Sequence, residues 1–323
     1  MTEHAPNRRT NPYVFFVGCP RSGTTLVRRI ADAHPDLAVI GEQHWLPRCW
    51  ERRNGIESDG TVKPALAEFV VADRRFRKID VAPERVRALC TERKPYASFV
   101  SELFDLHGAA QGKLLVGEKT PAYVRSIPTL HELWPDARIV HLIRDGRDVA
   151  LSLLSWNRAE RILGRLPTWA EDRLTTAALF WEWNVRQGRH AGADLGTLYY
   201  EMRYERLVGD PAGACRELCE FLSLAYDPSM LRFHEGRTRG GESAKSAWLP
   251  VTPGLRDWRA QMAGDERRRF EAAVGQLLDE LGYERTDPPS DEELRRAARL
   301  HEAFVEGVPA HWRAVPADSN VVA

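Results

Sequence analysis

The chain has 323 residues, and its 46 Lys and Arg balance 46 Asp and Glu, so no overall field draws it to nucleic acid or membrane and any basic site must be local. The longest apolar run near the start, residues 13–19, is far shorter than the about 20 residues of a membrane span, and we see no secretion leader before it. Five irregularly spaced cysteines are typical of reduced thiols, so we expect a cytoplasmic protein without a membrane or nucleic-acid partner.

Strand patterns alternate with helix patterns along the chain. We expect strands at residues 13–17, 114–117, 137–143 and 198–202, and helices at residues 26–31, 121–133, 149–156, 210–222, 266–281 and 291–305. This alternation predicts an α/β fold with a central parallel sheet and right-handed crossovers. One domain spans residues 1–323, with a helical insertion at 45–112 that we expect to form the acceptor pocket and a mobile C-terminal flap at 234–256.

The stretch GCPRSGTT, residues 18–25, follows the first expected strand and has the frame of a phosphate-binding loop. Thr24 stands where a nucleoside-triphosphate loop has its lysine, and the positive charge lies instead at Arg21. One arginine suits a terminal group of low charge without a metal, such as a sulfuryl group. A kinase that uses magnesium-ATP and a nucleotide-binding module without catalysis remain open.

A second anion-binding motif, IRDGRDVALS, covers residues 143–152 at the carboxyl end of an expected central strand. Open α/β sheets bind ligands at this edge. Arg144 leaves the strand end and Ser152 lies two turns into the next helix, so both can reach one phosphate. The alternative is an ion pair of Arg144 with Asp145 or Asp148.

The segments PRSGTTL and RDGRDVALS together resemble the two nucleotide-binding motifs of the PAPS-dependent sulfotransferases, and EKTP and RYERL resemble further segments of that family over about residues 12–233. The resemblance implies a three-layer P-loop NTPase-like α/β domain, with 3′-phosphoadenylyl sulfate (PAPS) as donor substrate and no metal. It also implies a role for each matching residue. The 5′-phosphosulfate would be bound by Arg21, Ser22, Gly23, Thr24 and Thr25, the 3′-phosphate by Arg144 and Ser152, and the adenine by Tyr204.

Sulfuryl transfer needs cations at the leaving oxygen and a base at the acceptor hydroxyl. Arg21 and Lys119 are our candidates for the first task, and a Lys119–Glu118 salt bridge is the alternative. Many cytosolic members have a histidine after the Lys-Thr pair, but here Pro121 occupies that position.

The base is therefore sought elsewhere. The segment around GEQHWLPR resembles the tyrosylprotein branch, whose Gly-Glu-Glu context supplies a glutamate base. This implies Glu42 as the base, with Gln43 in place of the second acid. His44 is the alternative base because its ordinary pKa is closer to neutrality. If Glu42 instead forms an ion pair with Arg48 at the surface, its role is structural.

The acceptor is expected to be a small molecule that offers a hydroxyl, less readily an amine, because no lumenal targeting is visible for a protein acceptor. Lys245, in the expected flap, could close over the nucleotide phosphates, although a solvated flap is an equal alternative.

Overall fold

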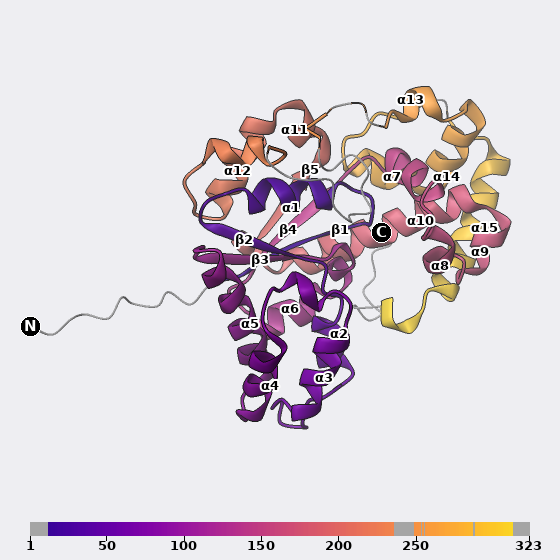
Figure 1. The fold of residues 1–323 in the computed structure, drawn as a ribbon. Coiled ribbons are helices and arrows are strands. Elements are labelled where there is room, and N and C mark those ends of the chain that lie inside the picture. Colours follow the sequence, from indigo (N-terminus) through magenta and orange to yellow (C-terminus); the bar gives the residue numbers. More distant parts are fainter. Residues whose placement is uncertain (1–11, 236–248, 253, 255, 287, 313–323) are drawn as a thin grey trace, which may run out of the picture.

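The computed structural model describes residues 12–235, 249–252, 254, 256–286 and 288–312. Its centre is a five-stranded sheet of order β2-β3-β1-β4-β5 in which all neighbouring strands pair in parallel (Figure 1). The strands are β1 Val14–Gly18, β2 Leu37–Gly41, β3 Leu115–Lys119, β4 Arg138–Ile143 and β5 Tyr199–Arg203. The predicted α/β class with a central parallel sheet is confirmed.

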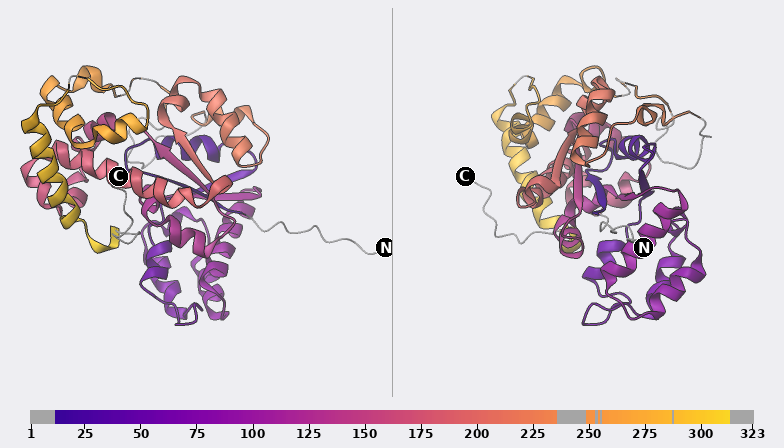
Figure 2. Two further views of the ribbon diagram at one scale, coloured as in Figure 1. Left: turned by 180° about the vertical axis from the view of Figure 1, so that it is seen from behind. Right: turned by 90° about the vertical axis from the view of Figure 1, so that its left-hand side faces the viewer.

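Helices cover both faces of the sheet and extend beyond its edge (Figures 1 and 2). Those from the first half of the chain are α1 Thr24–Asp32, α2 Leu46–Glu51, α3 Pro64–Ala72, α4 Pro83–Thr91, α5 Tyr96–Ala110, α6 Ile127–Leu133 and α7 Gly146–Leu154. Those from the second half are α8 Ala159–Leu163, α9 Pro167–Glu171, α10 Arg173–Ala193, α11 Tyr204–Gly209, α12 Pro211–Phe221, α13 Trp258–Gln261, α14 Gly264–Glu280 and α15 Asp291–Gly307. Short 3₁₀ turns include η2 Pro121–Arg125 and η5 Ala310–Trp312.

Alternate residues of β1 serve two separate cores, because successive strand side chains point to opposite faces. Phe15 and Val17 pack in a core with the helices of the insertion, which form the lobe that projects from one side of the sheet in Figure 1. Val14 and Phe16 pack in the core under α1 and α12 on the other side. Both faces are thus buried, which explains why the first strand is apolar throughout.

A third core joins the second half of the chain to α7. It is built around α10, and α14 and α15 pack against it (Figure 2, left). Arg147 of α7 lies within this part of the molecule, where it is fully buried and pairs with Asp145 at 2.8 Å and with Glu271 of α14 at 2.9 Å. The C-terminal helices are therefore fixed to the motif that follows β4.

The sequence prediction missed several elements, among them β2 and α10. In the described part of the chain, no helix is both long enough and apolar enough to cross a membrane.

Candidate active site

The phosphate-binding loop joins the end of β1 to the start of α1. Gly23 has φ 96°, and a Cβ there would lie 2.5 Å from the Tyr204 ring, so both its conformation and its contact require glycine. The first N–H groups of α1 have no partner within the helix and face an anion at this end. Ser22 Oγ is buried and has no hydrogen-bond partner among the described residues. A phosphate-type oxygen would satisfy these donors, so the loop fits such a ligand.

The second motif brings Arg144 and Ser152 to the same loop. Arg21 Nε donates to Ser152 Oγ at 3.0 Å, across 131 positions of sequence. Arg144 lies 4.2 Å from the centre of the Tyr204 ring, and its buried Nε has no partner in the described chain. Arg144 also pairs with Asp148 at 2.9 Å, so the contact considered as the alternative is present as well. The expected nucleotide-binding residues therefore lie together.

Sequence reasoning missed one cation of this group, Arg256, which it treated only as the end of the flap. Arg256 donates to Ser155 Oγ at 2.6 Å, one helical turn from Ser152. Burial lowers the pKa of Arg21, and the nearby charges of Arg256 and Arg144 lower it further. Three guanidinium groups that repel one another in this way are suited to a multiply charged anion.

The proposed proton acceptor and its lysine come from neighbouring strands. Gly41 pairs with Lys119 in the β2–β3 register, so Glu42 lies just beyond the strand ends next to that lysine. Lys119 Nζ donates to Glu42 Oε1 at 2.8 Å and to Thr25 Oγ1 of the loop at 3.4 Å. No ion pair joins Lys119 to Glu118, and none joins Glu42 to Arg48, among the described residues. Lys119 therefore bridges the loop and the candidate base.

Glu42 and His44 form one hydrogen-bonded pair, with 3.2 Å between His44 Nε2 and Glu42 Oε2. Burial alone would raise the pKa of Glu42, but the His44 hydrogen bond and the Lys119 charge hold it well below its usual range. Burial lowers the pKa of His44 despite the neighbouring carboxylate. At neutral pH the pair is therefore a carboxylate that accepts a hydrogen bond from a neutral imidazole.

The turn that carries Glu42 is anchored by a second, buried glutamate. Glu118 Oε1 accepts hydrogen bonds from the Gln43 backbone N–H at 3.0 Å and from Thr120 Oγ1 at 2.5 Å. The Gln43 side chain donates to the Gly41 carbonyl at 2.8 Å. Gln43, which replaces the second acid of the related motif, is thus a structural part of the turn.

Replacement of Glu118 by Gln should change how stability depends on pH. Burial raises the pKa of Glu118 from its ordinary value of 4.5 to about 8. The unfolded chain loses this proton at lower pH than the folded chain, so the native protein should lose several kcal/mol of stability between these two values as pH rises. Glu118→Gln should not show this loss. Urea unfolding of both proteins at about pH 5 and about pH 8 measures the change in unfolding free energy between these pH values. An equal change in the native protein and in Glu118→Gln would contradict a buried, protonated Glu118.

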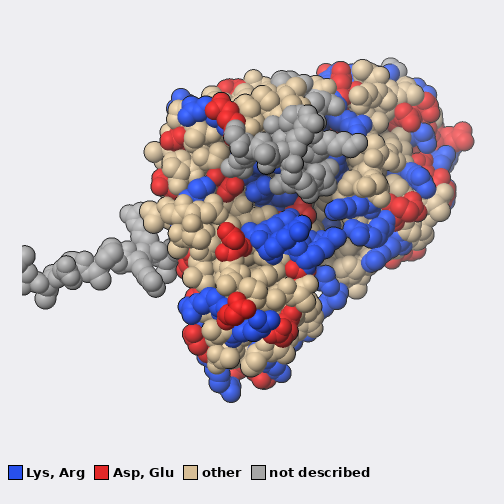
Figure 3. Space-filling model, in the orientation of Figure 1, with Lys and Arg blue, Asp and Glu red and all other residues tan. Residues whose placement is uncertain are grey.

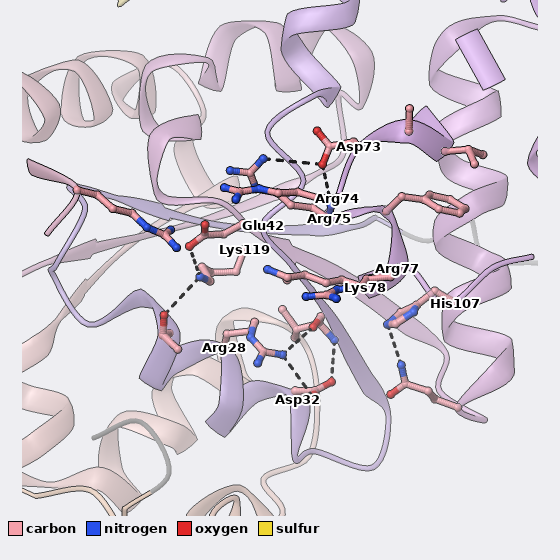
Figure 4. Close-up of a pocket in the computed structure, with 18 residues that line it drawn as sticks. Arg28, Asp32, Glu42, Asp73, Arg74, Arg75, Arg77, Lys78, His107 and Lys119 are labelled. Atoms are coloured by element: carbon pink, nitrogen blue, oxygen red, sulfur yellow. Dashed lines mark hydrogen bonds and ion pairs between the residues drawn. The ribbon is translucent and has the colours of Figure 1, made fainter. Parts of the chain in front are cut away.

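Two cavities meet at Glu42. The larger, of about 1140 Å³, contains the nucleotide-binding residues, and the smaller, of about 720 Å³, runs along the lobe of the insertion. They share Thr25, Glu42, Arg75 and Arg158. Figure 4 shows the smaller cavity, which we call the basic groove. Its cationic side chains are Arg28, Arg74, Arg75, Arg77, Lys78, Lys119 and Arg158.

The basic groove is strongly positive although the whole chain is neutral. Among the described residues, three acids line it, Asp32, Glu42 and Asp73, and Lys and Arg gather on this face of the molecule (Figure 3). Sequence reasoning placed the acceptor pocket in the insertion but did not find this charge. Arg74, Arg75, Arg77 and Lys78 are consecutive or nearly so, and this run was the available signal.

Other expectations remain as they were. Lys245 lies outside the described residues, and so does most of the expected flap. Within the described ranges, no group of three or more His, Cys, Asp and Glu side chains is arranged to hold a metal ion.

Comparison with known proteins places this site in a family. The model of the sulfotransferase family matches residues 12–228. A putative protein-tyrosine sulfotransferase of Caenorhabditis briggsae is 26% identical over 86% of this chain and 91% of its own length. Protein-tyrosine sulfotransferase 1 of Danio rerio is 27% identical over 86% of this chain and 74% of its own, and the human protein of that name is 28% identical over 86% and 72%.

Solved structures share the fold. The sulfotransferase domain from the Synechococcus PCC 7002 olefin synthase aligns with a TM-score of 0.57 at 21% identity, over 87% of this chain and 98% of that one. The sulfotransferase domain from the curacin biosynthetic pathway aligns with a TM-score of 0.53, also at 21% identity, over 89% and 96%.

The expected small-molecule acceptor is wrong. The relatives that match along most of the chain are protein-tyrosine sulfotransferases, which act on proteins. The prediction rested on the lack of visible targeting, and a targeting signal says nothing about the shape or charge of an acceptor site.

Proposed function

The chain belongs to the sulfotransferase family, and from that premise we propose that it transfers the sulfuryl group of PAPS to the hydroxyl of a tyrosine in an acidic segment of a protein. The observation that carries the proposal is the position of the Glu42–Lys119 pair. It lies between the phosphate-binding loop, which Lys119 contacts through Thr25, and the basic groove, which Glu42 and Lys119 both line.

The donor nucleotide fits the larger cavity by charge. Arg144, Arg256 and Ser152 would hold the 3′-phosphate, and the loop amides with Ser22 and Thr24 would hold the 5′-phosphosulfate. Arg21, hydrogen-bonded to Ser152, lies between the two groups. Tyr204 packs on Gly23 and on Arg144, which supports its place at the nucleotide.

Glu42 and Lys119 would divide the chemistry. Sulfuryl transfer forms a bond from the tyrosine oxygen to sulfur and breaks the bond from sulfur to the 5′-phosphate oxygen. Glu42 takes the hydroxyl proton, while Lys119 and Arg21 stabilise the negative charge that develops on the leaving phosphate oxygen. As Lys119 turns toward that oxygen, Glu42 loses its ion pair and becomes a stronger base.

The basic groove supports a polypeptide acceptor with acidic residues near the tyrosine. Four of its cations, Arg74, Arg75, Arg77 and Lys78, lie on the lobe of the insertion, and Arg28 of α1 lines the same groove (Figure 4). Opposite charges at partly exposed positions accelerate encounter and fix the register of the bound chain, and added salt screens them.

Two tyrosine peptides that differ only in glutamate or glutamine flanks test this acceptor. With PAPS as donor and the sulfopeptide measured by mass spectrometry, the KM of the glutamate peptide should be about tenfold lower or more than that of the glutamine peptide, and this difference in KM should shrink as salt rises. Replacing Arg74 and Arg77 by glutamine should reduce the difference in KM. The control Arg232→Gln, outside both cavities, should leave it unchanged. Equal KM values at low salt would contradict an acidic acceptor.

A further inference from the structure

The larger cavity is also lined by residues to which the donor nucleotide assigns no role, and we call the part that they line the inner chamber. It is lined by Pro121, Ala122, Arg125, Ile162, Phe180 and Trp312. Arg125 is the last residue of η2, and η2 begins two residues after Lys119, the last residue of β3. The short turn η2 therefore connects a residue of the transfer site to a residue of the inner chamber. Glu42 and His44 line the same cavity.

Neighbouring side chains hold the guanidinium of Arg125 in place. Arg125 Nη1 donates to Asn184 Oδ1 at 2.7 Å, and the Asn184 amide is itself fixed because its Nδ2 donates to the Phe180 carbonyl at 2.7 Å. The centre of the Trp312 ring lies 4.8 Å from the Arg125 guanidinium carbon. The centre of the Phe180 ring lies 5.4 Å from the centre of the Trp312 ring. This arrangement orients a planar cation against an aromatic wall.

Arg125 has no acidic partner within the part of the chain that the structure describes. Its contacts there are an amide oxygen and an aromatic ring. Burial lowers the pKa of Arg125 to about 10, so it stays protonated at neutral pH. Arg125 is half-buried, and a partly desolvated cation without a counter-ion is costly, so an anionic ligand would reduce that cost.

The entrance to the inner chamber carries the same sign of charge. Arg161 and Arg165 are exposed at its rim, and neither has an ion pair in the described ranges. Nearby His311 has its pKa lowered by burial and by a group of arginines that includes Arg125 and Arg165. Among the described residues, the chamber thus combines apolar side chains with several cations and no acid of its own.

We propose that the inner chamber binds a second anionic group of the acceptor, carried on an apolar or aromatic stem, and that Arg125 and Trp312 thereby determine acceptor specificity. The proposal rests on the proposed function. Two side chains have this chemistry, a glutamate and a tyrosine already sulfated in an earlier turnover. In either case the chamber differs from the basic groove, because among the described residues no groove cation stacks on an aromatic ring as Arg125 does on Trp312.

Direct binding of a small probe tests the inner chamber without turnover. p-Cresyl sulfate, titrated by calorimetry into protein saturated with adenosine 3′,5′-bisphosphate, should bind the native chain. Arg125→Met and Trp312→Ala should each weaken this binding about tenfold or more. The matched control is Arg173→Met, which removes an arginine stacked on Trp169 outside both cavities and should change nothing.

Other outcomes of this titration overturn the proposal. Binding that Arg125→Met leaves unchanged and Lys119→Met abolishes would assign the probe to the transfer site. Absence of any binding to the native protein would equally contradict an anion site here. If Arg125→Met does not fold, Arg125→Lys replaces it. This variant keeps the charge but not the planar fork, and it should lose at least part of the affinity.

Peptides identify which anionic group is bound. Tyrosine peptides that carry glutamate, glutamine, sulfotyrosine or phenylalanine at one neighbouring position are compared for KM in the native chain and in Arg125→Met. The native chain should prefer one anionic residue over its neutral counterpart, and Arg125→Met should weaken that preference while Arg173→Met keeps it in full. Because the basic groove also attracts acidic residues, the inference is overturned if Arg125→Met leaves the preference undiminished. Failure of the native chain to modify any tyrosine peptide instead contradicts the proposed function, and the probe titration still reports on the chamber.

Discussion

Glu42→Gln should lower turnover about 100-fold or more while binding of adenosine 3′,5′-bisphosphate stays within about twofold, because the change removes a proton acceptor and no phosphate ligand. Glu42 is ionised in the folded protein, held so by His44 and Lys119. An amide in its place can accept a hydrogen bond but cannot take the proton of the acceptor hydroxyl. Steady-state kinetics with saturating donor, beside calorimetry on the same samples, measures both quantities.

His44 provides the matched comparison. Its imidazole is neutral and donates to Glu42, so it orients the carboxylate rather than replacing it. His44→Ala should therefore lower turnover less than Glu42→Gln does. If Glu42→Gln keeps its turnover and His44→Ala abolishes it, the histidine is the base and the assignment to Glu42 is wrong.

Arg144→Ala should weaken binding of adenosine 3′,5′-bisphosphate by about 2 kcal/mol or more, because it leaves one phosphate without a charged partner. Arg144 is buried beside Tyr204, and its Nε has no partner among the described residues, so a phosphate oxygen has an oriented donor there. Calorimetric titration with the bisphosphate measures the loss.

The ion pair of Arg144 with Asp148 requires a control, since Arg144→Ala also strips Asp148 of its partner. Asp148→Asn keeps an oxygen for the Trp258 N–H, which donates to Asp148 at 3.0 Å, and it frees the arginine. That variant should bind the bisphosphate at least as tightly as the native chain. Weaker binding in Asp148→Asn, or unchanged binding in Arg144→Ala, would contradict the phosphate site.

The sequence was sufficient to predict where the phosphate-binding loop lies between the first strand and the first helix, and that a helix follows the strand that carries Arg144 at its end. Each is a short segment with a distinctive set of residue types. The sequence was not sufficient for β2. Residues 37–41 form a five-residue apolar run between a helix and the insertion, and periodicity cannot assign so short a run. Glu42 was found only through the resemblance, although its place after β2 explains why it meets Lys119.

Contacts between distant segments account for most of what was missed. The hydrogen bond of Arg21 to Ser152 spans 131 positions, and no local pattern encodes it. α10 was missed because 13 of its 21 residues are buried, so it lacks the polar face that marks a surface helix. The inner chamber combines Arg125, Asn184 and Trp312, which only the packing of α10 and the chain end onto η2 brings together.

The central claim, that this chain moves a sulfuryl group from PAPS to a protein tyrosine, is tested most directly by one transfer experiment. The native protein is incubated with sulfur-labelled PAPS and a glutamate-flanked tyrosine peptide in the presence of EDTA, beside the same peptide with phenylalanine for tyrosine. Tandem mass spectrometry should place the label on the tyrosine oxygen, with none on the phenylalanine peptide and no need for a metal. Absence of label on tyrosine, together with magnesium-dependent phosphate transfer from ATP, would contradict the account.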